Sequence, residues 1–465
     1  VTKWSYCIQT IEEVPLVLDI AFKIANDGKK GPVHIDLPKC IASSIYPNNV
    51  ENNFEELRNI EAKYVHKVKK LPIGSKVIQN IAKVINTSKN PVLYVGQGCR
   101  DSSNLLRQFA IKANIPVTTT LHGMGIFDET DYLSLEMVGM HGSVYANYAI
   151  QEADLIIGIG TRFDDRTVGN IEKYAPRARE AERNGTGGII HIDISNNSFD
   201  KTIKPTYKIK EDCKKVLEYM LPYIDHKQIY QRKEWFTQID TWKKNYPFKY
   251  KKNYNIQIPD VLLSINNELS QYNNYYISTG VGNHQMMAAQ YIKWRKPRNI
   301  ITSGSLGTMG SGLPYAIGAQ VANPDELVVL IDGDGSFNMT LNDLATVAEY
   351  NLPIKIAIMN DSRLQMVHVW QELFFNNNII GTELKNPDFC KLAESYGIKS
   401  MRVSDKKDLS KSVKEFIEYP GPILCDFTIE PSMCLPLVSP GKALDDMILE
   451  STSDIRIDSK ENLPC

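Results

Sequence analysis

A short run of glycines and aspartates carries the clearest chemical signal in the sequence. The run 331–336 reads Ile-Asp-Gly-Asp-Gly-Ser, and Asn360 and Asp361 follow a later apolar segment. Glycines let backbone N–H groups approach an anion, and aspartate oxygens suit a hard cation such as Mg2+. Gly-Asp-Gly is also a common turn by itself. Two acidic strand ends together, however, predict a metal-bound diphosphate held by Asp334, a second side-chain oxygen and a nearby backbone carbonyl.

Parallel strands would bring these segments to one edge of a sheet. Apolar runs of this kind alternate with amphipathic helical stretches along the chain, which predicts an α/β fold of consecutive doubly wound parallel-sheet domains. Two domains are predicted, 71–225 with strands at 91–96, 154–160 and 188–194, and 257–440 with strands at 327–332, 354–359 and 422–429. Ligands of such domains bind at the carboxyl ends of the strands.

The first 45 residues contain too little structure for a domain. Apolar residues between Leu16 and Ile24 recur at helical spacing, Gly28 ends the helix, and 31–38 predicts one buried strand. One helix and one strand cannot make a domain, so we expect the last unit of a domain whose body is missing from the chain. The remaining segments are predicted as a linker at 46–70, a linker with a helix at 226–256, and a tail at 441–465.

Composition excludes several classes of protein. A net charge of -1 on 465 residues gives no overall positive electrostatic field that would attract nucleic acid. No run approaches the roughly 18 to 20 apolar residues that span a membrane. The eight cysteines show no paired spacing, which favours free thiols in a reducing compartment. Motifs of zinc proteases and serine hydrolases are absent, and the glycine-rich run 307–312 precedes rather than follows an apolar strand, unlike a dinucleotide loop.

Several motifs together resemble the catalytic subunit of acetolactate synthase (acetohydroxyacid synthase), a thiamine-diphosphate enzyme. They are Gly-Asp-Gly with the later Asn360, and the tracts 280–285, 303–320 and 366–370. The resemblance implies Asp334, Asp361 and the Arg363 carbonyl as magnesium ligands. It implies contacts with thiamine diphosphate for Gly282, Asn283, His284, Gly307, Met309, Gly333, Gly335, Ser336, Met366 and Val367. Met309 would be wedged between the two rings of the cofactor and enforce its bent, reactive shape.

The resemblance extends through the middle of the chain, where the family binds FAD without redox chemistry. The implied FAD contacts are Gly96, Gly98, Thr120, Leu121, His122, Met140, Gly160, Arg162, Asp164, Arg166, Asp193 and Asp212. Asp193 also ends an apolar strand, where an acid can bind ribose. Arg166 resembles the arginine that anchors the second substrate's carboxylate, although an ion pair with Asp164 or Asp165 is an alternative. Trp370 resembles the residue that favours 2-oxobutanoate, and core packing is its alternative.

The implied reaction decarboxylates pyruvate and joins the product to a second 2-oxo acid. The products are 2-acetolactate or, with 2-oxobutanoate, 2-aceto-2-hydroxybutanoate, for branched-chain amino acid synthesis. The family implies a homodimer or tetramer, possibly with a regulatory small subunit, and an intracellular location that is cytoplasmic in bacteria and plastid or mitochondrial in eukaryotes. Its activating glutamate belongs to the pyrimidine-binding domain, of which only the final 45 residues are expected here, so the isolated chain should be inactive.

Three positions depart from the family pattern. Asp361 stands in place of asparagine and adds a negative charge beside the metal, while Gln9 stands in place of a channel lysine. Gln365 replaces a glycine, and we expect backbone strain of about 1 kcal/mol if that position needs a positive φ, together with crowding of the cofactor. These departures leave open a non-catalytic cofactor-binding paralogue. A pyruvate oxidase or glyoxylate carboligase is another alternative, which Arg166 and Trp370 disfavour.

Overall fold

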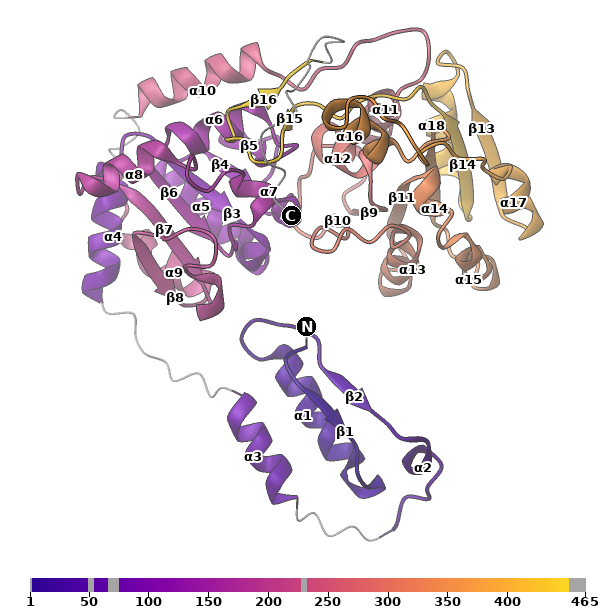
Figure 1. The fold of residues 1–465 in the computed structure, drawn as a ribbon, viewed down its shortest axis with the longest axis horizontal. Helices are drawn as coiled ribbons and strands as arrows, with labels where there is room; N and C mark the ends of the chain where they lie inside the picture. Colours follow the sequence, from indigo (N-terminus) through magenta and orange to yellow (C-terminus); the bar gives the residue numbers. More distant parts are fainter. Residues whose placement is uncertain (1, 49–53, 66–74, 227–231, 451–465) are drawn as a thin grey trace. The chain divides into compact units, whose positions relative to one another are not determined.

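The computed structural model describes residues 2–48, 54–65, 75–226 and 232–450 (Figure 1). The chain divides into two compact units, Val1–Ile78 with Ile194–Ser198, and Gln79–Asp193 with Phe199–Cys465. Each unit has its own hydrophobic core. None of the described helices is both long enough and apolar enough to cross a membrane.

The smaller unit is a β-α-β element with additional helices. Strand β1 (Ser5–Cys7) pairs in parallel with β2 (His34–Asp36), and α1 (Val14–Asn26) connects them. The predicted helix is α1 and the predicted strand is β2. The expectation that this strand is buried is wrong, because Ile35 is only half-buried and His34 and Asp36 are exposed. Strand β1 was not predicted because three residues are too few to show an alternation of apolar and polar side chains. Helix α3 (Glu55–Tyr64) lies within the predicted linker 46–70, and its polar composition concealed it. Helix α2 (Lys39–Ala42) precedes α3. Helix α4 (Ser75–Thr87) follows α3 in the chain and belongs mostly to the larger unit.

The central part of the larger unit is a six-stranded parallel sheet. Its order is β5-β4-β3-β6-β7-β8. The strands are β3 (Pro91–Val95), β4 (Val117–Thr119), β5 (Ser134–Met137), β6 (Leu155–Ile159), β7 (Gly188–Asp193) and β8 (Tyr207–Lys210). The helices are α5 (Ser103–Ala113), α6 (Val144–Glu152), α7 (Asp165–Val168), α8 (Pro176–Arg183) and α9 (Cys213–Met220). The strands predicted at 91–96, 154–160 and 188–194 are the buried β3, β6 and β7.

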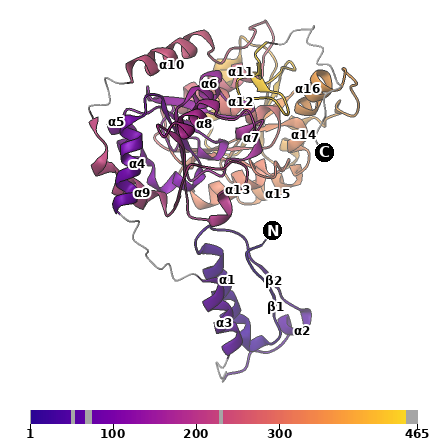
Figure 2. The ribbon, with the colours of Figure 1, turned by 60° about the vertical axis from the view of Figure 1, so that its left-hand side comes forward.

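A second six-stranded parallel sheet follows, in the order β10-β9-β11-β12-β14-β13. Its strands are β9 (Tyr275–Thr279), β10 (Ile300–Ile301), β11 (Leu327–Gly333), β12 (Lys355–Asn360), β13 (Lys399–Val403) and β14 (Ile423–Thr428). Its helices are α11 (Ile258–Leu269), α12 (Asn283–Tyr291), α13 (Gly312–Ala322), α14 (Asp334–Phe337), α15 (Leu344–Glu349), α16 (Gln365–Phe374), α17 (Phe389–Ser395) and α18 (Leu409–Glu418). Helices α11, α12 and α18 pack on one face, and α13, α15 and α17 on the other. Figure 2 shows α11 and α12 above α13 and α15.

Both sheets are doubly wound, as predicted. In each sheet, the first strand is central and the next strands are added on one side of it. The chain then crosses to the other side of the first strand and adds the remaining strands there. The loops that follow the two strands at this crossing therefore leave toward opposite faces of the sheet. This switch point lies between β3 and β6 in the central sheet and between β9 and β11 in the second sheet. A crevice therefore forms at the carboxyl edge of each sheet, between those two strands.

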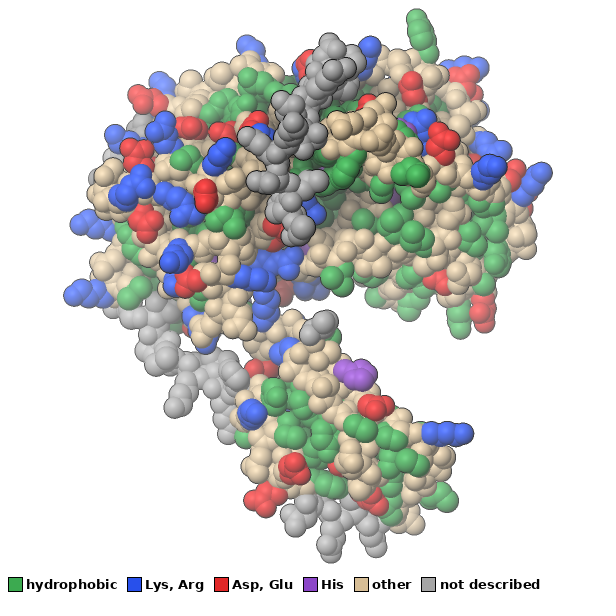
Figure 3. Space-filling model, in the orientation of Figure 1, with side chains coloured by type: hydrophobic (Ala, Val, Ile, Leu, Met, Phe, Trp, Pro, Cys, Tyr) green, Lys and Arg blue, Asp and Glu red, His purple; other side chains and the backbone are tan. Residues whose placement is uncertain are grey.

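The segment between the sheets contains the predicted helix, and the C-terminal segment returns to the central core. Helix α10 (Lys233–Asn245) buries Trp235 and Phe236. The last described strands, β15 (Leu437–Val438) and β16 (Met447–Ile448), pair in antiparallel beside α6 and β5 (Figure 1). The N–H of Val438 donates to the carbonyl of Met140, at 2.8 Å. Charges of both signs are interspersed on the visible face of the larger unit (Figure 3).

Replacing Ser143 with alanine should destabilise the larger unit. Ser143 caps α6, its hydroxyl accepting from the N–H of Ala146 at 3.1 Å and donating to the carbonyl of Leu135 at 2.8 Å. Because the site is buried, water cannot replace the lost hydroxyl as partner of the Ala146 N–H and the Leu135 carbonyl. We therefore expect the unfolding free energy to fall by about 1 to 2 kcal/mol. Urea denaturation measures this, and Ser143→Thr, which retains the hydroxyl, should lose less than Ser143→Ala.

Candidate active site

A small pocket lies at the switch point of the second sheet. It is formed by the loops after β9, β11 and β12 and by the start of α16. Its lining includes these predicted residues: Gly282, Asn283, His284, Met309, Gly333, Asp334, Gly335, Ser336, Asp361, Arg363, Met366 and Val367. Gly307 does not line it but belongs to the same loop as Met309. The pocket thus brings together residues that are up to 109 positions apart, from Ile258 to Val367.

Glycines keep the backbone of this pocket accessible. Gly282, with φ of +150°, precedes α12, whose first N–H groups have no partner within the helix. A Cβ on Gly333 would lie 2.6 Å from Nδ1 of His284, and one on Gly335 would lie 2.5 Å from Leu364. The Ser336 hydroxyl accepts from the N–H of Gly310 at 3.0 Å. Unblocked N–H groups at a helix start suit an anion such as a diphosphate.

Two carboxylates lie together in this pocket. Asp334 follows β11 and is 2% exposed, and Asp361 follows β12 and accepts from the N–H of Arg363 at 3.1 Å. Burial raises the pKa of both, and the neighbouring charge of Asp334 helps to raise the pKa of Asp361 to about 7. Two buried acids that oppose each other's ionisation would be stabilised by a divalent cation. The residues therefore fit Mg2+.

Protein side chains alone do not complete a metal site here. Among the described residues, no group of three or more His, Cys, Asp or Glu side chains could hold a metal ion. A magnesium ion prefers six oxygen ligands and commonly takes several from phosphates and water. Two carboxylates and a carbonyl match such a partial set, with the phosphates as the remaining ligands.

Asn386 supports this site and was missed in the sequence. Its amide donates to Oδ2 of Asp334 at 2.6 Å and to Oδ1 of Asn360 at 3.1 Å, and its own oxygen accepts from Asn338 at 2.8 Å. It links the ends of β11 and β12. Asn386 lies in a loop after α16 with no motif around it, so no signal in the sequence could have identified it.

Asp332 forms the buried floor of the switch point. It is fully buried, its Oδ1 accepts from the N–H of Gly333 at 2.9 Å, and the same oxygen lies 3.3 Å from Nε2 of His284. A Cβ on Gly280 would lie 1.8 Å from that oxygen. The Asp332 carboxylate thus lies beside the His284 ring. Asp332 was predicted only as the last residue of the strand 327–332, and no spacing in the sequence marks it as a site residue.

The condition for backbone strain at Gln365, a positive φ, is not met. Gln365 is the first residue of α16, and the left-handed residue of this turn is Ser362, with φ of +57°. The Gln365 side chain is 8% exposed and lines the pocket, and its amide donates to the carbonyl of Ser432 at 3.2 Å. Asn283 donates to the same carbonyl at 2.8 Å. Gln365 therefore connects α16 to the segment after β14.

Gln365→Ala should weaken this connection without relieving strain. The variant loses a buried hydrogen bond, and we expect about 1 kcal/mol less unfolding free energy. Urea denaturation of Gln365→Ala and Gln365→Gly gives the result, and the glycine variant should be the less stable of the two because helical φ does not favour glycine. A glycine variant more stable than the parent would contradict this reading of the turn.

Trp370 and Arg166 lie outside the residues that line the pocket. Trp370 packs edge-to-face on Phe374, with ring centroids 5.3 Å apart. The Arg166 side chain is 63% exposed, its Nε lies 3.7 Å from Oδ2 of Asp165, and its Nη1 lies 3.8 Å from Sδ of Met140. These contacts correspond to the packing and ion-pair alternatives. The substrate roles of both residues stay predictions.

The residues predicted for FAD gather at the carboxyl edge of the central sheet. Gly96 and Gly98 follow β3, Gly160 follows β6, and a Cβ on Gly96 would lie 2.4 Å from the Gly160 carbonyl. The others follow strands or loops of the same edge: Thr120, Leu121, His122, Met140, Arg162, Asp164, Arg166, Asp193 and Asp212. A glycine-lined switch point is the expected place for a dinucleotide. The glycines allow the loops after β3 and β6 to pack closely here, and the binding of FAD at this edge stays a prediction.

Two of these acids also have structural partners. Asp212 caps α9, accepting from the N–H of Lys214 at 2.9 Å, and Asp164 lies 3.4 Å from Nε of Arg162. The edge also contacts the second sheet's loops, since a Cβ on Gly304 would lie 2.6 Å from Nε2 of His122. Burial lowers the pKa of His122.

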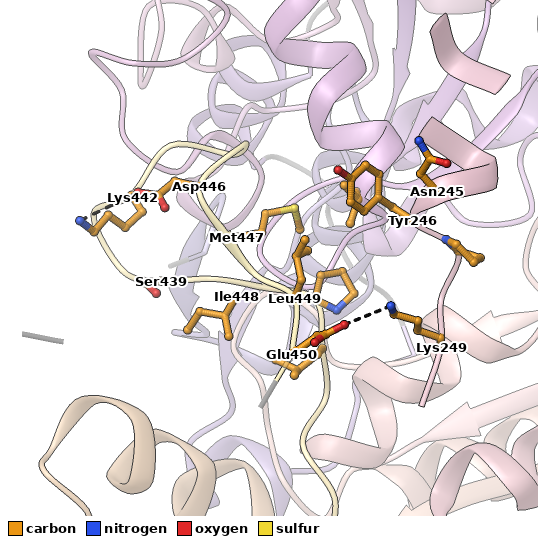
Figure 4. A pocket seen from close by; sticks show the side chains of 14 residues that line it. Asn245, Tyr246, Lys249, Ser439, Lys442, Asp446, Met447, Ile448, Leu449 and Glu450 are labelled. Carbon is orange, nitrogen blue, oxygen red and sulfur yellow. Dashed lines mark hydrogen bonds and ion pairs between the residues drawn. The ribbon is translucent and has the colours of Figure 1, made fainter. Parts of the chain in front are cut away.

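A larger cavity, of about 640 Å3, lies between the end of α10, α6 and the C-terminal segment (Figure 4). Its rim charges pair with each other, Lys249 with Glu450 at 3.2 Å and Lys442 with Asp446 at 3.9 Å. None of the predicted site residues lines it. Size alone does not make it the active site, because the convergent glycines and acids lie at the switch point.

Comparison with known proteins gives matches in both sheets. Residues 280–427 match the family described as "Thiamine pyrophosphate enzyme, C-terminal TPP binding domain", and residues 78–220 match its "central domain". The chain is 42% identical over 458 residues to "Acetolactate synthase catalytic subunit, mitochondrial" of Saccharomyces cerevisiae, covering 96% of this chain and 66% of the relative. It is 40% identical to the "Acetolactate synthase, mitochondrial" of Schizosaccharomyces pombe (97% and 69%) and 39% identical to "Acetolactate synthase 2, chloroplastic" of Nicotiana tabacum (97% and 67%). The chain spans about two thirds of the length of these relatives.

Proposed function

This chain belongs to the acetolactate synthase catalytic-subunit family of thiamine-diphosphate enzymes, and from that premise we propose that its protein joins two 2-oxo acids after decarboxylating the first. Pyruvate is the proposed donor, and pyruvate or 2-oxobutanoate the acceptor. The observation that carries the proposal is the convergence of Asp334, Asp361 and the glycines of two loops at one switch point. When bound, thiamine diphosphate supplies the carbon nucleophile for this chemistry.

The residues of the pocket bind and orient the cofactor. Asp334, Asp361 and the Arg363 carbonyl hold Mg2+, and backbone N–H groups near Gly282 and Gly335 bind the diphosphate oxygens. The remaining proposed contacts are Asn283, His284, Gly307, Gly333, Ser336, Met366 and Val367. Met309, which lines the pocket, supports the bent shape of the cofactor through its bulk and performs no proton transfer.

The proposal extends to the central sheet and to the substrate. FAD occupies the edge formed by the loops after β3 and β6 and has a structural role. Arg166 binds the acceptor's carboxylate through its planar donors, after release of its weak, exposed pair with Asp165. Trp370 contacts the apolar end of 2-oxobutanoate. A second copy of the chain and a regulatory subunit are the proposed partners, in an organelle as the relatives' names state for those proteins.

One observation favours a second candidate, a non-catalytic cofactor-binding paralogue. Gln365 and Asp361 add bulk and negative charge to the pocket, where the family pattern has glycine and asparagine. Both candidates bind thiamine diphosphate, so binding alone does not separate them. Product formation does.

Acetolactate formation from pyruvate tests the proposal, with thiamine diphosphate, Mg2+ and FAD supplied. The chain is compared with a fusion that carries, at its N-terminus, the part of the Saccharomyces cerevisiae relative that precedes the matched region. We expect acetolactate from the fusion and none from the fusion carrying Asp334→Ala. A folded fusion that binds thiamine diphosphate but forms no acetolactate would refute the synthase and support the paralogue.

A further inference from the structure

Two cysteines of the central sheet lie against each other and have no part in the proposed function. Cys99 belongs to the 3-10 turn 97–102 after β3, and Cys213 is the first residue of α9. The Cys213 thiol donates to the carbonyl of Gly98 at 3.1 Å, and its sulfur lies 3.7 Å from Oγ of Ser102. Cys213 therefore contacts the turn on both sides of Cys99. Both thiols are free.

The surroundings make these two thiols chemically unequal. A hydrogen bond between them raises the pKa of Cys99 well above its ordinary range and lowers the pKa of Cys213. Cys213 also lies at the N-terminus of a helix, where the helix dipole favours a thiolate. Cys213 is 5% exposed and Cys99 is 0% exposed, so a reagent entering from solvent meets Cys213 first.

We propose that Cys99 and Cys213 form a redox-active dithiol, a modification site that a low-molecular-weight disulfide of the glutathione type converts into an intramolecular disulfide. The thiolate of Cys213 attacks one sulfur of the reagent, forming a mixed disulfide and releasing one thiolate. Cys99 then loses its proton and attacks the Cys213 sulfur, and the second thiolate leaves. The two cysteines are oxidised and one reagent disulfide is reduced to two thiols, so atoms and electrons balance.

The position of the pair gives the modification a structural consequence. The new bond would connect the turn after the central strand β3 to the start of α9, which follows the edge strand β8. Gly98 and Asp212 are the immediate neighbours of the two cysteines. Oxidation would therefore fix the loops at the carboxyl edge of this sheet. The inference does not depend on the synthase activity.

Peptide mapping tests the dithiol directly. The native full chain is incubated with oxidised glutathione, its remaining thiols are alkylated, and it is digested without reduction for mass spectrometry. We expect a linked peptide pair that contains Cys99 and Cys213 and that disappears on reduction. Alkylation of both cysteines after oxidation of a folded chain would overturn the proposal, as would a link that forms only in urea.

Single substitutions distinguish the two roles. In Cys99→Ser, the glutathione adduct should persist on Cys213 because the second thiol is missing. In Cys213→Ser, Cys99 should stay unmodified. Cys425→Ser, which changes a fully buried thiol on β14, should leave the link intact. An adduct on Cys99 but not on Cys213 would refute the assignment, and the mapping of the unsubstituted chain decides the proposal if a variant does not fold.

Discussion

Asp334→Ala is expected to lower the affinity of the chain for thiamine diphosphate in Mg2+ by at least about 100-fold, or about 3 kcal/mol. Asp334 is buried at the end of β11, where the pocket meets the start of α14. Its removal takes away one of two carboxylates for the metal and one of the two acceptors of the Asn386 amide. Without the metal, the repulsion between diphosphate and Asp361 is uncompensated. Isothermal titration calorimetry at fixed Mg2+ measures the affinity.

Asp325→Ala is the matched control for that experiment. Asp325 is exposed just before the amino end of β11, so the same charge is removed at the opposite edge of the same sheet. Its affinity should equal that of the parent within about twofold. If Asp334→Ala and Asp325→Ala bind thiamine diphosphate equally well, the metal and diphosphate do not bind at this switch point.

The sequence predicted those strands whose composition is continuous and apolar. The predicted segments 91–96 and 327–332 correspond to β3 and β11, because buried parallel strands are β-branched runs that end at glycine or acidic residues. Those endings also placed Asp334 and Asp361 correctly at one edge. The residues themselves did not indicate that the strands pair in parallel, and this was predicted only from the fold class.

Shorter and more polar elements could not be recognised. Strand β4 has three residues, and β9 reads Tyr-Tyr-Ile-Ser-Thr. In neither strand does the pattern of apolar residues differ from what a loop could show. Contacts between distant residues were equally hidden. Asn386 reaches Asp334 only because the loop after α16 folds back, and Cys213 meets Cys99 only because α9 packs on the turn after β3. Ser362 adopts the left-handed conformation. A glycine at this position would have indicated the positive φ in the sequence, but a serine does not.

Asp361→Asn is expected to stabilise the metal-free chain at alkaline pH and to have little effect at acid pH. The pKa of Asp361 is about 7 in the folded chain and near 3.8 ordinarily, mainly because of burial and then because of Asp334. The folded state therefore holds a proton that the unfolded state releases. Stability from this carboxyl is fully present below about pH 4 and is lost as pH rises through 7. The loss is on the order of 4 kcal/mol at pH 8, and an asparagine cannot ionise.

Unfolding free energies from urea denaturation between pH 5 and 8.5 check this sign, with the metal removed by a chelator. The advantage of Asp361→Asn over the parent should grow with pH at up to about 1.4 kcal/mol per unit and level off above pH 7. Asp325→Asn removes the same charge from an exposed site and should show no such trend. Mg2+ should reverse the order at pH 8, because it stabilises the ionised pair of the parent more than the single carboxylate of the variant. A difference in unfolding free energy between Asp361→Asn and the parent that does not change with pH would show that Asp361 is already ionised in the folded chain. Another positive or hydrogen-bonding group would then have to stabilise the two carboxylates.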